Sequence, residues 1–289
     1  MAPLPSLLPD PKASPRPHRV LLMGATGTIG RATAVALVAR GHAVTCLVRA
    51  GTDPGRLPGT IVVEGDVRDP AAFAKAAAAR GPFDAVVSCL ASRTGAPSDA
   101  WAIDFQAHRD VLAGAREAGV AHMVLLSAIC VQKPLLAFQK AKLAFEEALI
   151  ASGLAWSIVR PTAFFKSLSG QIARVQAGRP FLIFGDGALT ACKPISDGDL
   201  AAFIADCLDD PDRQNRILPI GGPGPAVTPR EQGEALFALT GRPVRFRRVP
   251  VALLDGIIAG LGLAGRVVPA LADKAEFARI GRYYATESM

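Results

Sequence analysis

A glycine-rich segment, GATGTIG at residues 24–30, constrains the fold of this chain more than any other feature. It follows the apolar run Arg19–Met23 directly and precedes a helical pattern over residues 28–40. Glycines at this spacing, between a strand and a helix, are typical of a turn that binds a dinucleotide. Gly24 permits the tight turn, Gly27 lets the backbone approach a pyrophosphate, and Gly30 allows close helix–strand packing. A structural turn without a ligand is the weaker interpretation.

Short apolar runs alternate with helical patterns from the start of this motif to residue 160. Strands are predicted at residues 19–23, 43–48, 60–63, 85–88, 122–127 and 155–159, and helices at residues 28–40, 70–80, 101–118 and 134–152. Such alternation indicates βαβ units and a parallel sheet that is covered on both faces. We therefore predict an α/β fold with a Rossmann-type, doubly wound parallel sheet.

The pattern changes after residue 160. Short strands are predicted at residues 181–184 and 217–220, among helices at residues 197–208, 229–240 and 251–263. We expect a smaller C-terminal lobe at the carboxyl edge of the sheet. The predicted regions are a disordered, proline-rich arm (1–18), an NADP-binding Rossmann domain (19–160) and a mixed α/β substrate lobe interleaved with the sheet (161–289).

Composition excludes several classes of protein. Half of the residues are hydrophobic and 20% are charged, which excludes a disordered chain. The five cysteines are odd in number and far apart, which argues against a disulfide framework or a cysteine-held metal and favours a reducing, cytoplasmic compartment. The net charge is +7, but the basic residues are mostly scattered and aromatics make up 6%, so nucleic-acid binding is not expected. No apolar stretch is long enough for a spanning helix, and the N-terminus lacks the features of a signal peptide.

The residue after the second predicted strand favours NADPH over NADH. Enzymes that use NAD usually place a carboxylate there for the ribose 2′-hydroxyl, whereas this chain has Arg49. A guanidinium group can pair with a 2′-phosphate; the alternative is an ordinary surface arginine. Asp66 and Val67 follow the third strand, where we expect them to contact the adenine. The full set of predicted cofactor-binding residues is Gly24, Thr26, Gly27, Thr28, Ile29, Gly30, Arg49, Asp66, Val67, Ser88 and Lys142.

These features resemble the NmrA-like branch of the atypical short-chain dehydrogenase/reductase superfamily. The resemblance covers residues 19–225 and includes the glycine motif, the GDV of residues 65–67, the strand ending in Ser127, Lys142, the SIVRPT of residues 157–162 and the PISD of residues 194–197. It implies the same nucleotide-binding fold.

Longer segments resemble the family of divinyl chlorophyllide a 8-vinyl-reductases. They are LLSAICVQKPLLAFQKAKLAFE (125–146), RPTAFFKSLSGQ (160–171), FGDGALTACKPISDGDL (184–200), NRILPIGGPGPAVTPREQGEALF (215–237) and IGRYYATESM (280–289). This resemblance implies NADPH-dependent reduction of the 8-vinyl group of divinyl chlorophyllide or protochlorophyllide to ethyl, in chlorophyll or bacteriochlorophyll synthesis. The implied partner is therefore a tetrapyrrole.

Short-chain reductases generally carry a Tyr-x-x-x-Lys pair, and this chain has Phe138 and Lys142 at the corresponding positions. Phe138 cannot transfer a proton, which argues against ordinary carbonyl chemistry. Reduction of a conjugated vinyl group is compatible with this change, because the macrocycle can spread the negative charge after hydride addition. We expect Lys142 to be the catalytic residue and to hold the nicotinamide ribose; a plain surface lysine is the alternative.

Residues after the fifth and sixth strands are the candidates for substrate contact, because ligands bind at the carboxyl edge of such sheets. The predicted substrate-binding residues are Ser127, Phe138, Phe164, Phe165, Lys166 and Lys193, with Cys130 and Lys133 facing the same cleft. The lysines would meet a propionate of the pigment. His108 and His122 could ligate its magnesium, although structural roles are favoured, and no metal site of the protein itself is expected.

The sequence leaves open the role of residues 242–265 and the meaning of the missing tyrosine. Arg242, Arg245, Arg247 and Arg248 precede a sparsely charged run over residues 249–265, which suits contact with anionic lipid or, with slight preference, a core helix with a solvated basic approach. The missing tyrosine also fits a non-catalytic, NADP-sensing regulator, and a quinone or isoflavone-type reductase is a third interpretation.

Overall fold

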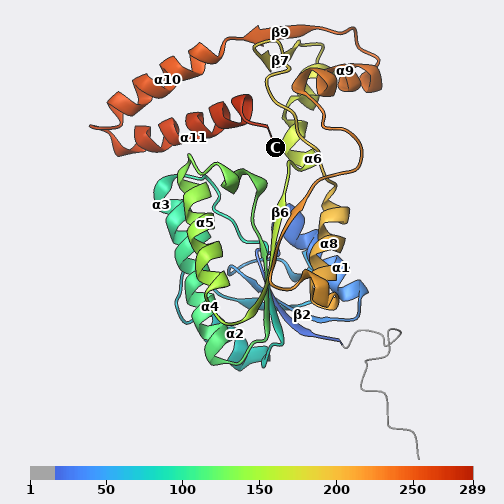
Figure 1. The fold of residues 1–289 in the computed structure, drawn as a ribbon, viewed down its shortest axis with the longest axis vertical. Helices are drawn as coiled ribbons and strands as arrows, with labels where there is room; N and C mark the ends of the chain where they lie inside the picture. The colour runs from blue at the N-terminus through green and yellow to red at the C-terminus, as the bar shows by residue number, and fades with distance from the viewer. Residues whose placement is uncertain (1–16, 289) are drawn as a thin grey trace, which may run out of the picture.

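Seven parallel strands form the centre of the computed structural model, which describes residues 17–288 (Figure 1). The order across the sheet is β3-β2-β1-β4-β5-β6-β8, and all neighbouring pairs are parallel. This confirms the predicted doubly wound α/β fold. The strands are β1 (Arg19–Met23), β2 (Ala43–Val48), β3 (Ile61–Glu64), β4 (Ala85–Ser88), β5 (His122–Leu126), β6 (Ala155–Pro161) and β8 (Arg216–Ile220).

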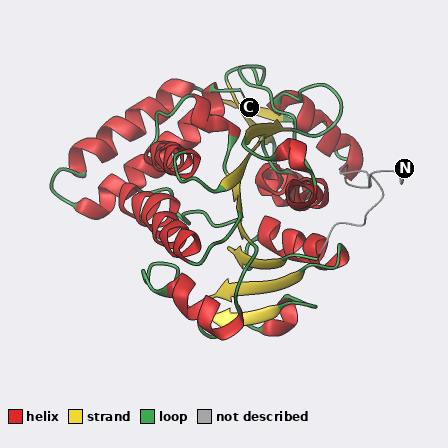
Figure 2. Ribbon diagram, turned by 60° about the horizontal axis from the view of Figure 1, so that its bottom comes forward, coloured by secondary structure: helices red, strands yellow, loops and turns green. Residues whose placement is uncertain are grey.

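Helices cover both faces of this sheet (Figures 1 and 2). On one face lie α1 (Thr28–Ala39) and α8 (Asp197–Asp209), and on the other lie α2 (Ala72–Arg80), α4 (His108–Glu117) and α5 (Ala137–Ile150). In β1, Val20 and Leu22 pack beneath α1 and α8, whereas Leu21 and Met23 pack beneath the opposite helices. Both faces of the strand are buried, which explains why its sequence is continuously apolar.

The helix predicted over residues 101–118 is divided into two segments, a π-helical segment η2 (Trp101–Ala107) and α4. A further short helix, α3 (Pro97–Ala100), precedes them. The hydrophobic pattern did not reveal this change of pitch. Segments of π-helix inside α-helices often occur at functional sites.

Two elements that we had placed with the C-terminal lobe belong to the main sheet. β8 pairs with β6 as the seventh strand, and α8 packs along α1. Buried residues of α8, such as Leu200 and Ile204, complete the core on that face of the sheet. The chain after residue 160 is thus interleaved with the sheet, because the apolar face of α8 packs against the sheet and against α1.

The remaining elements form a small layer above the carboxyl edge of the sheet (Figure 1). In it, β7 (Phe181–Phe184) pairs in parallel with β9 (Phe246–Val249), next to α9 (Pro229–Thr240). Phe181 and Phe237 each meet Phe246 edge to face, with ring centroids 6.1 and 5.8 Å away. The short helical segments of the fold are η1 (Pro54–Arg56), η3 (Ile129–Gln132), α6 (Phe165–Leu168), η4 (Ser169–Gln171), α7 (Ile172–Gln176) and η5 (Pro211–Arg213).

The chain ends in a helical hairpin of α10 (Val251–Ala264) and α11 (Pro269–Thr286). The sequence did not predict α11. α10 packs along α11, and none of its 14 residues is buried. The preferred interpretation of residues 249–265 as a core helix is therefore wrong, because the part of the chain that the structure describes buries none of the residues of α10.

The structure describes residues 17–288, which bears on three expectations from the sequence. The proline-rich arm predicted over residues 1–18 lies, up to residue 16, outside the described residues. Within residues 17–288, no helix has both the length and the apolar character needed to cross a membrane, and no cluster of His, Cys, Asp or Glu is arranged to hold a metal.

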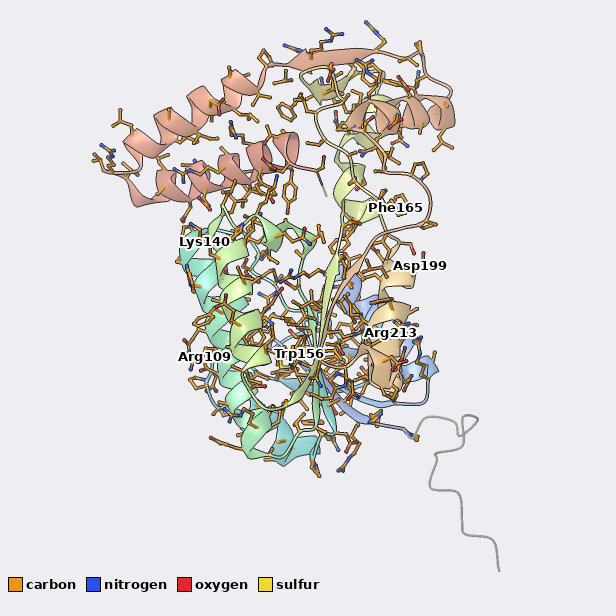
Figure 3. All side chains as sticks on the ribbon, in the orientation of Figure 1. Arg109, Lys140, Trp156, Phe165, Asp199 and Arg213 are labelled. Atoms are coloured by element: carbon orange, nitrogen blue, oxygen red, sulfur yellow. The ribbon has the colours of Figure 1, made fainter. Side chains whose placement is uncertain are left out.

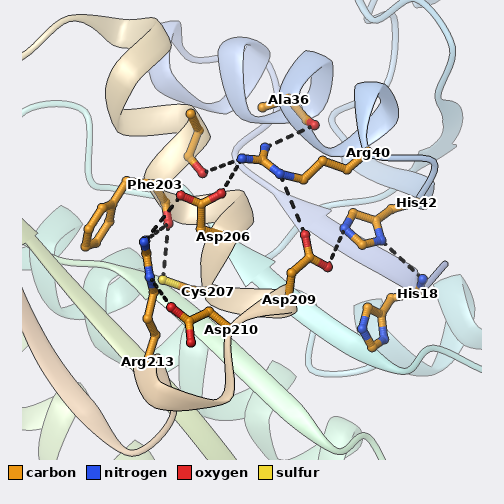
Figure 4. Close-up of polar contacts among 11 residues, drawn as sticks. His18, Ala36, Arg40, His42, Phe203, Asp206, Cys207, Asp209, Asp210 and Arg213 are labelled. Carbon is orange, nitrogen blue, oxygen red and sulfur yellow. Dashed lines mark hydrogen bonds and ion pairs between the residues drawn. The ribbon is translucent and has the colours of Figure 1, made fainter. Parts of the chain in front are cut away.

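A network of ion pairs joins the C-terminal ends of α1 and α8 (Figure 4). Arg40 pairs with Asp206, and Arg213 lies 3.0 Å from Asp210 and stacks over Phe203. Both helices run from the carboxyl edge of the sheet to its amino edge, so this network lies at the opposite end of the molecule from the predicted ligand sites. We assign it a structural role.

Candidate functional site

The glycine motif forms the turn between β1 and α1, at the point where the strand order reverses between β1 and β4. Gly24 has φ +73°, and a Cβ there would lie 2.6 Å from the backbone of Cys89. A Cβ on Gly30 would lie 2.1 Å from the carbonyl oxygen of Gly24. Both positions therefore require glycine, and the turn lies at the crevice where doubly wound sheets bind ligands.

The N-terminus of α1 offers the features that a pyrophosphate needs. Its N-cap residue, Gly27, makes no side-chain hydrogen bond to the first turn, and that turn contains no acidic residue. Thr26 and Gly27 are exposed, so the free N–H groups and the positive end of the helix dipole can meet a phosphate. The Ile29 side chain lies in the core, which leaves only its backbone for the cofactor. The residues present fit a dinucleotide.

Two basic residues, Arg49 and Arg68, lie after β2 and β3, at the carboxyl edge of the sheet. Arg68 binds Asp66 with nitrogen–oxygen distances of 2.6 and 3.1 Å, and this interaction lowers the pKa of Asp66 to about 2. Arg49 also acts on that carboxylate, is exposed, and has no ion pair within residues 17–288. Val67 packs against the core. Asp66 thus remains ionised, and the two arginines leave a net positive charge where a 2′-phosphate would lie.

Lys142 lies on α5 and forms a buried ion pair. Its Nζ is 3.0 Å from Oδ1 of Asp104, which belongs to the π-helical segment η2. That oxygen also accepts a hydrogen bond from the backbone N–H of Ser92, at 3.2 Å. The second carboxylate oxygen, Oδ2, is buried without a partner among the described residues. The sequence predicted Lys142 but gave no sign of Asp104.

Ser88 was predicted to bind the cofactor, but its hydroxyl is fully buried and lies 2.7 Å from Nε2 of His108. The other ring nitrogen of His108 lies 2.8 Å from the carbonyl oxygen of Ile103, so the ring is saturated with partners. Burial, together with the charge of Lys142, lowers the pKa of His108 to about 4. His108 is therefore a neutral structural residue beside Lys142 and is not free to ligate magnesium.

His122 lies at the start of β5, at the amino edge of the sheet, and its Nε2 is 3.0 Å from the Ser157 hydroxyl. Burial lowers its pKa to about 4. This position is remote from the crevice, so the alternative role of His122 as a magnesium ligand is wrong.

Ser127 was predicted to contact the substrate, but it is buried and donates a hydrogen bond to Glu146 of α5. Arg160 pairs with the same carboxylate. The three residues join the ends of β5 and β6 to α5 beneath the crevice. The Ser127 hydroxyl is therefore occupied within the protein, and its role is to support the site.

A cavity of about 400 Å³ opens beyond the carboxyl ends of β5 and β6. Lys142 is not among the lining residues, but its charge acts on the thiol of Cys130, which is one of them. The lining comes from the ends of β5 and β6, the 190–192 segment, the start of α9 and the end of α11: Ala128, Ile129, Cys130, Pro161, Thr162, Ala163, Phe164, Thr190, Ala191, Cys192, Val227, Pro229, Gln232, Tyr284 and Glu287.

The predicted aromatic contacts divide around this cavity. Phe164 lines it, whereas Phe165 is 57% exposed on α6, above the sheet (Figure 3). Phe138 packs with Leu136 against Ile280 of α11 and is not among the lining residues. The residue that replaces the usual tyrosine is thus covered by the C-terminal helix.

The two predicted lysines also separate. Nζ of Lys166 donates to Oγ1 of Thr28 at 2.6 Å, in the first turn of α1, so it lies beside the phosphate-binding turn. Lys193 is exposed, and its backbone carbonyl accepts hydrogen bonds from Thr162 and from Gly222 N–H. Contact of Lys193 with a propionate stays a prediction, whereas the position of Lys166 favours the cofactor.

The end of α11 contributes residues to the site that the sequence did not predict there. Tyr284 and Glu287 line the cavity, and Lys133 of the facing loop forms an ion pair with Glu287 at 2.8 Å. In the sequence, this terminal segment was singled out only by its resemblance to the reductase family. Its two adjacent tyrosines were the available signal, in a chain that contains no others.

Comparisons with known proteins agree with this geometry. A family model for NAD(P)H-binding proteins matches residues 24–211. The chloroplastic divinyl chlorophyllide a 8-vinyl-reductase of Zea mays is 50% identical over 304 aligned positions, covering 97% of this chain and 76% of that protein. The Arabidopsis thaliana protein of the same name is 47% identical, covering 96% of this chain and 70% of that protein.

Solved structures show the same fold. The NADPH-dependent quinone oxidoreductase QOR2 of Escherichia coli, in complex with NADPH, has a TM-score of 0.67 at 19% identity, covering 91% of this chain and 90% of that one. A UDP-glucose 4-epimerase of Thermotoga maritima has a TM-score of 0.69 at 17% identity, covering 80% and 85%. At these identities the likeness concerns the fold alone.

Proposed function

The chain belongs to the family of divinyl chlorophyllide a 8-vinyl-reductases, and from that premise we propose that it reduces the 8-vinyl group of a divinyl chlorophyllide or protochlorophyllide to ethyl, with NADPH. The observation that carries the proposal is one of placement. The dinucleotide turn and a largely apolar cavity lie at the same edge of the sheet, and the charge of the buried Lys142 acts on Cys130 in the cavity wall. A reductase needs its cofactor and substrate sites to meet in this way.

The protein's own residues would bind the cofactor along the crevice. Gly27 and the first turn of α1 would hold the pyrophosphate, with Lys166 beside them. Arg49 and Arg68 would face the 2′-phosphate, and Lys142 would hold the nicotinamide ribose. When bound there, NADPH supplies the hydride.

The cavity would receive the vinyl-bearing edge of the macrocycle. Phe164 and the apolar ends of β5 and β6 form its wall, and Lys193 at the rim would meet a propionate. The absence of a tyrosine at position 138 suits this substrate, because hydride addition to a conjugated vinyl group creates a delocalised carbanion and no alkoxide, so the proton can come from another position.

We place the protein's work at a membrane surface, within the compartment that makes the pigment. The α10 helix is apolar except for Asp255, which pairs with Arg282 of α11, and none of its residues is buried. Four exposed arginines lie just before it: Arg242, Arg245, Arg247 and Arg248. None of these four arginines has an ion pair within residues 17–288. An apolar helix next to free positive charge suits the surface of anionic lipid.

The decisive experiment is incubation of the protein with NADPH and divinyl chlorophyllide, followed by chromatography of the pigment. We expect the 8-ethyl product to form, faster with NADPH than with NADH, and not at all without a reduced cofactor. Parallel reactions with protochlorophyllide and with a quinone test the substrate class. A protein that binds NADPH but leaves all three substrates unchanged would be a regulator and would refute the proposal.

A further inference from the structure

Vinyl reduction needs a proton as well as a hydride, and the usual donor position cannot supply one. Phe138 has no ionisable group, and it lies under α11 instead of in the cavity. The chain contains just two tyrosines, Tyr283 and Tyr284, and both are on α11. All of its phenol groups are thus on the element that closes one side of the candidate active site.

The two phenols have different surroundings. Tyr283 is buried, and its hydroxyl donates a hydrogen bond to the carbonyl oxygen of Cys130 at 3.2 Å. Tyr284 lines the cavity together with Cys130 and is 40% exposed. The rings are perpendicular, with an interplanar angle of 89°. One tyrosine therefore fixes the helix to the loop after β5, and the other presents a phenol to the cavity.

Most other polar groups of the lining are engaged. Glu287 is paired with Lys133, and the Thr162 hydroxyl donates to the carbonyl oxygen of Lys193. Gln232 donates its amide to the carbonyl oxygen of Val227, at 3.4 Å. The thiol of Cys130, whose pKa is raised by burial, is the competing acid next to Tyr284.

The end of α11 is held firmly enough to position a reacting group. Besides the Tyr283 hydrogen bond and the Lys133–Glu287 ion pair, the backbone N–H of Ala191 donates to the Ser288 hydroxyl at 3.1 Å. These contacts lie on both sides of Tyr284 in the sequence and reach two separate lining segments.

We propose that Tyr284 is the proton donor of the vinyl reduction. This assignment rests on the proposed function. In the step, one vinyl carbon would take the hydride from NADPH and the other the proton of Tyr284. Two C–H bonds would form, while the π bond of the vinyl group, the donor C–H bond of NADPH and the tyrosine O–H bond would break. NADPH is oxidised to NADP⁺, the vinyl group is reduced to ethyl, and the tyrosinate recovers a proton from water.

The test compares Tyr284→Phe with the matched control Tyr283→Phe, which also removes one hydroxyl from α11. We expect Tyr284→Phe to lower kcat by about 100-fold or more, the usual contribution of a general acid. Its KM for the pigment and its Kd for NADPH, from cofactor fluorescence, should stay within about threefold of the wild-type values. Tyr283→Phe should retain most of kcat. Cys130→Ala should do so as well, which separates the phenol from the thiol.

Full activity of Tyr284→Phe overturns the assignment and leaves the proposed function intact, as does an equal loss in Cys130→Ala. If the wild-type protein forms no ethyl product, the proposed function and the assignment both fail. If Tyr284→Phe no longer binds NADPH, fluorotyrosine incorporated into the Tyr283→Phe protein decides, since Tyr284 is then the only tyrosine. Fluorine lowers the phenol pKa, so a kcat changed by more than twofold supports the assignment and an unchanged kcat overturns it.

Discussion

Nζ of Lys142 lies 3.0 Å from Oδ1 of Asp104, and the side chains of both residues are buried, the aspartate completely. The lysine comes from α5 and the aspartate from the π-helical segment η2. A buried charge is tolerated only when it is paired, so each residue fixes the other's position. The position of the Lys142 ammonium group is thus set by a residue 38 positions earlier in the chain.

Removing either partner of this pair should affect both folding and turnover. Asp104→Ala should lower the free energy of unfolding by about 3–5 kcal/mol, because it leaves a buried ammonium group unpaired. Lys142→Ala should lower turnover strongly by misplacing the nicotinamide. Lys140, an exposed lysine on the same helix (Figure 3), is the control, and Lys140→Ala should change neither. Urea unfolding and steady-state kinetics measure the effects, and unaltered kinetics of Lys142→Ala would refute its role.

Arg49 should determine the preference for NADPH. Arg49→Ala should weaken NADPH binding by about 10- to 100-fold, the range expected for a lost hydrogen bond to a charged group. NADH binding should barely change, since NADH has no 2′-phosphate. Arg80→Ala, at the end of α2 and the opposite edge of the sheet, is the control. Equal losses for the two cofactors, measured by fluorescence titration, would contradict the assignment.

The two lysines once grouped as pigment contacts should behave differently. Lys166→Ala should raise the Kd for NADPH, because its ammonium group lies on Thr28 beside the phosphate-binding turn. Lys193→Ala should instead raise the KM for the pigment and leave NADPH binding unchanged. Loss of pigment affinity alone in Lys166→Ala would restore the original sequence-based prediction.

Two buried histidines predict loss of stability in acid. The pKa values of His108 and His122 are lowered to about 4, below the unfolded value near 6.5. Between these values the unfolded chain binds protons that the folded chain does not, so stability falls as pH falls from 6.5 to 4. Each histidine should remove about 2 kcal/mol between pH 7 and pH 5. Urea unfolding of His108→Gln and His122→Gln should each show a correspondingly flatter pH profile.

The exposed hairpin should bind anionic vesicles. At low salt we expect the protein to float with vesicles that contain anionic lipid, and at high salt to release them, because each basic residue near the surface contributes about 1 kcal/mol and is screened by salt. Leu253→Ser with Ile257→Ser should abolish binding without unfolding the protein, since both side chains are exposed. A control with Arg80→Gln and Arg116→Gln, at the far edge, should still bind. No flotation at low salt would refute membrane contact and leave the reductase assignment standing.

The sequence by itself determined the sheet and its nucleotide turn, because both depend on local patterns. The positions of Gly24 and Gly30, between an apolar strand and a helix, require a backbone geometry that only one kind of turn provides. Likewise β1, β2 and β4 have the predicted bounds, since strands buried on both faces are continuously apolar.

Only the tertiary structure decided which side chains meet in the site. Ser88 and Ser127 lie at the carboxyl ends of β4 and β5, but their hydroxyls are hydrogen-bonded to His108 and Glu146. Phe138 of α5 packs against α11. Asp104 and Tyr284 are far from Lys142 in the sequence, and no local pattern relates them to it. The reason is physical: periodicity records which face of an element is buried, whereas the partners of a buried polar group depend on how distant elements pack against each other.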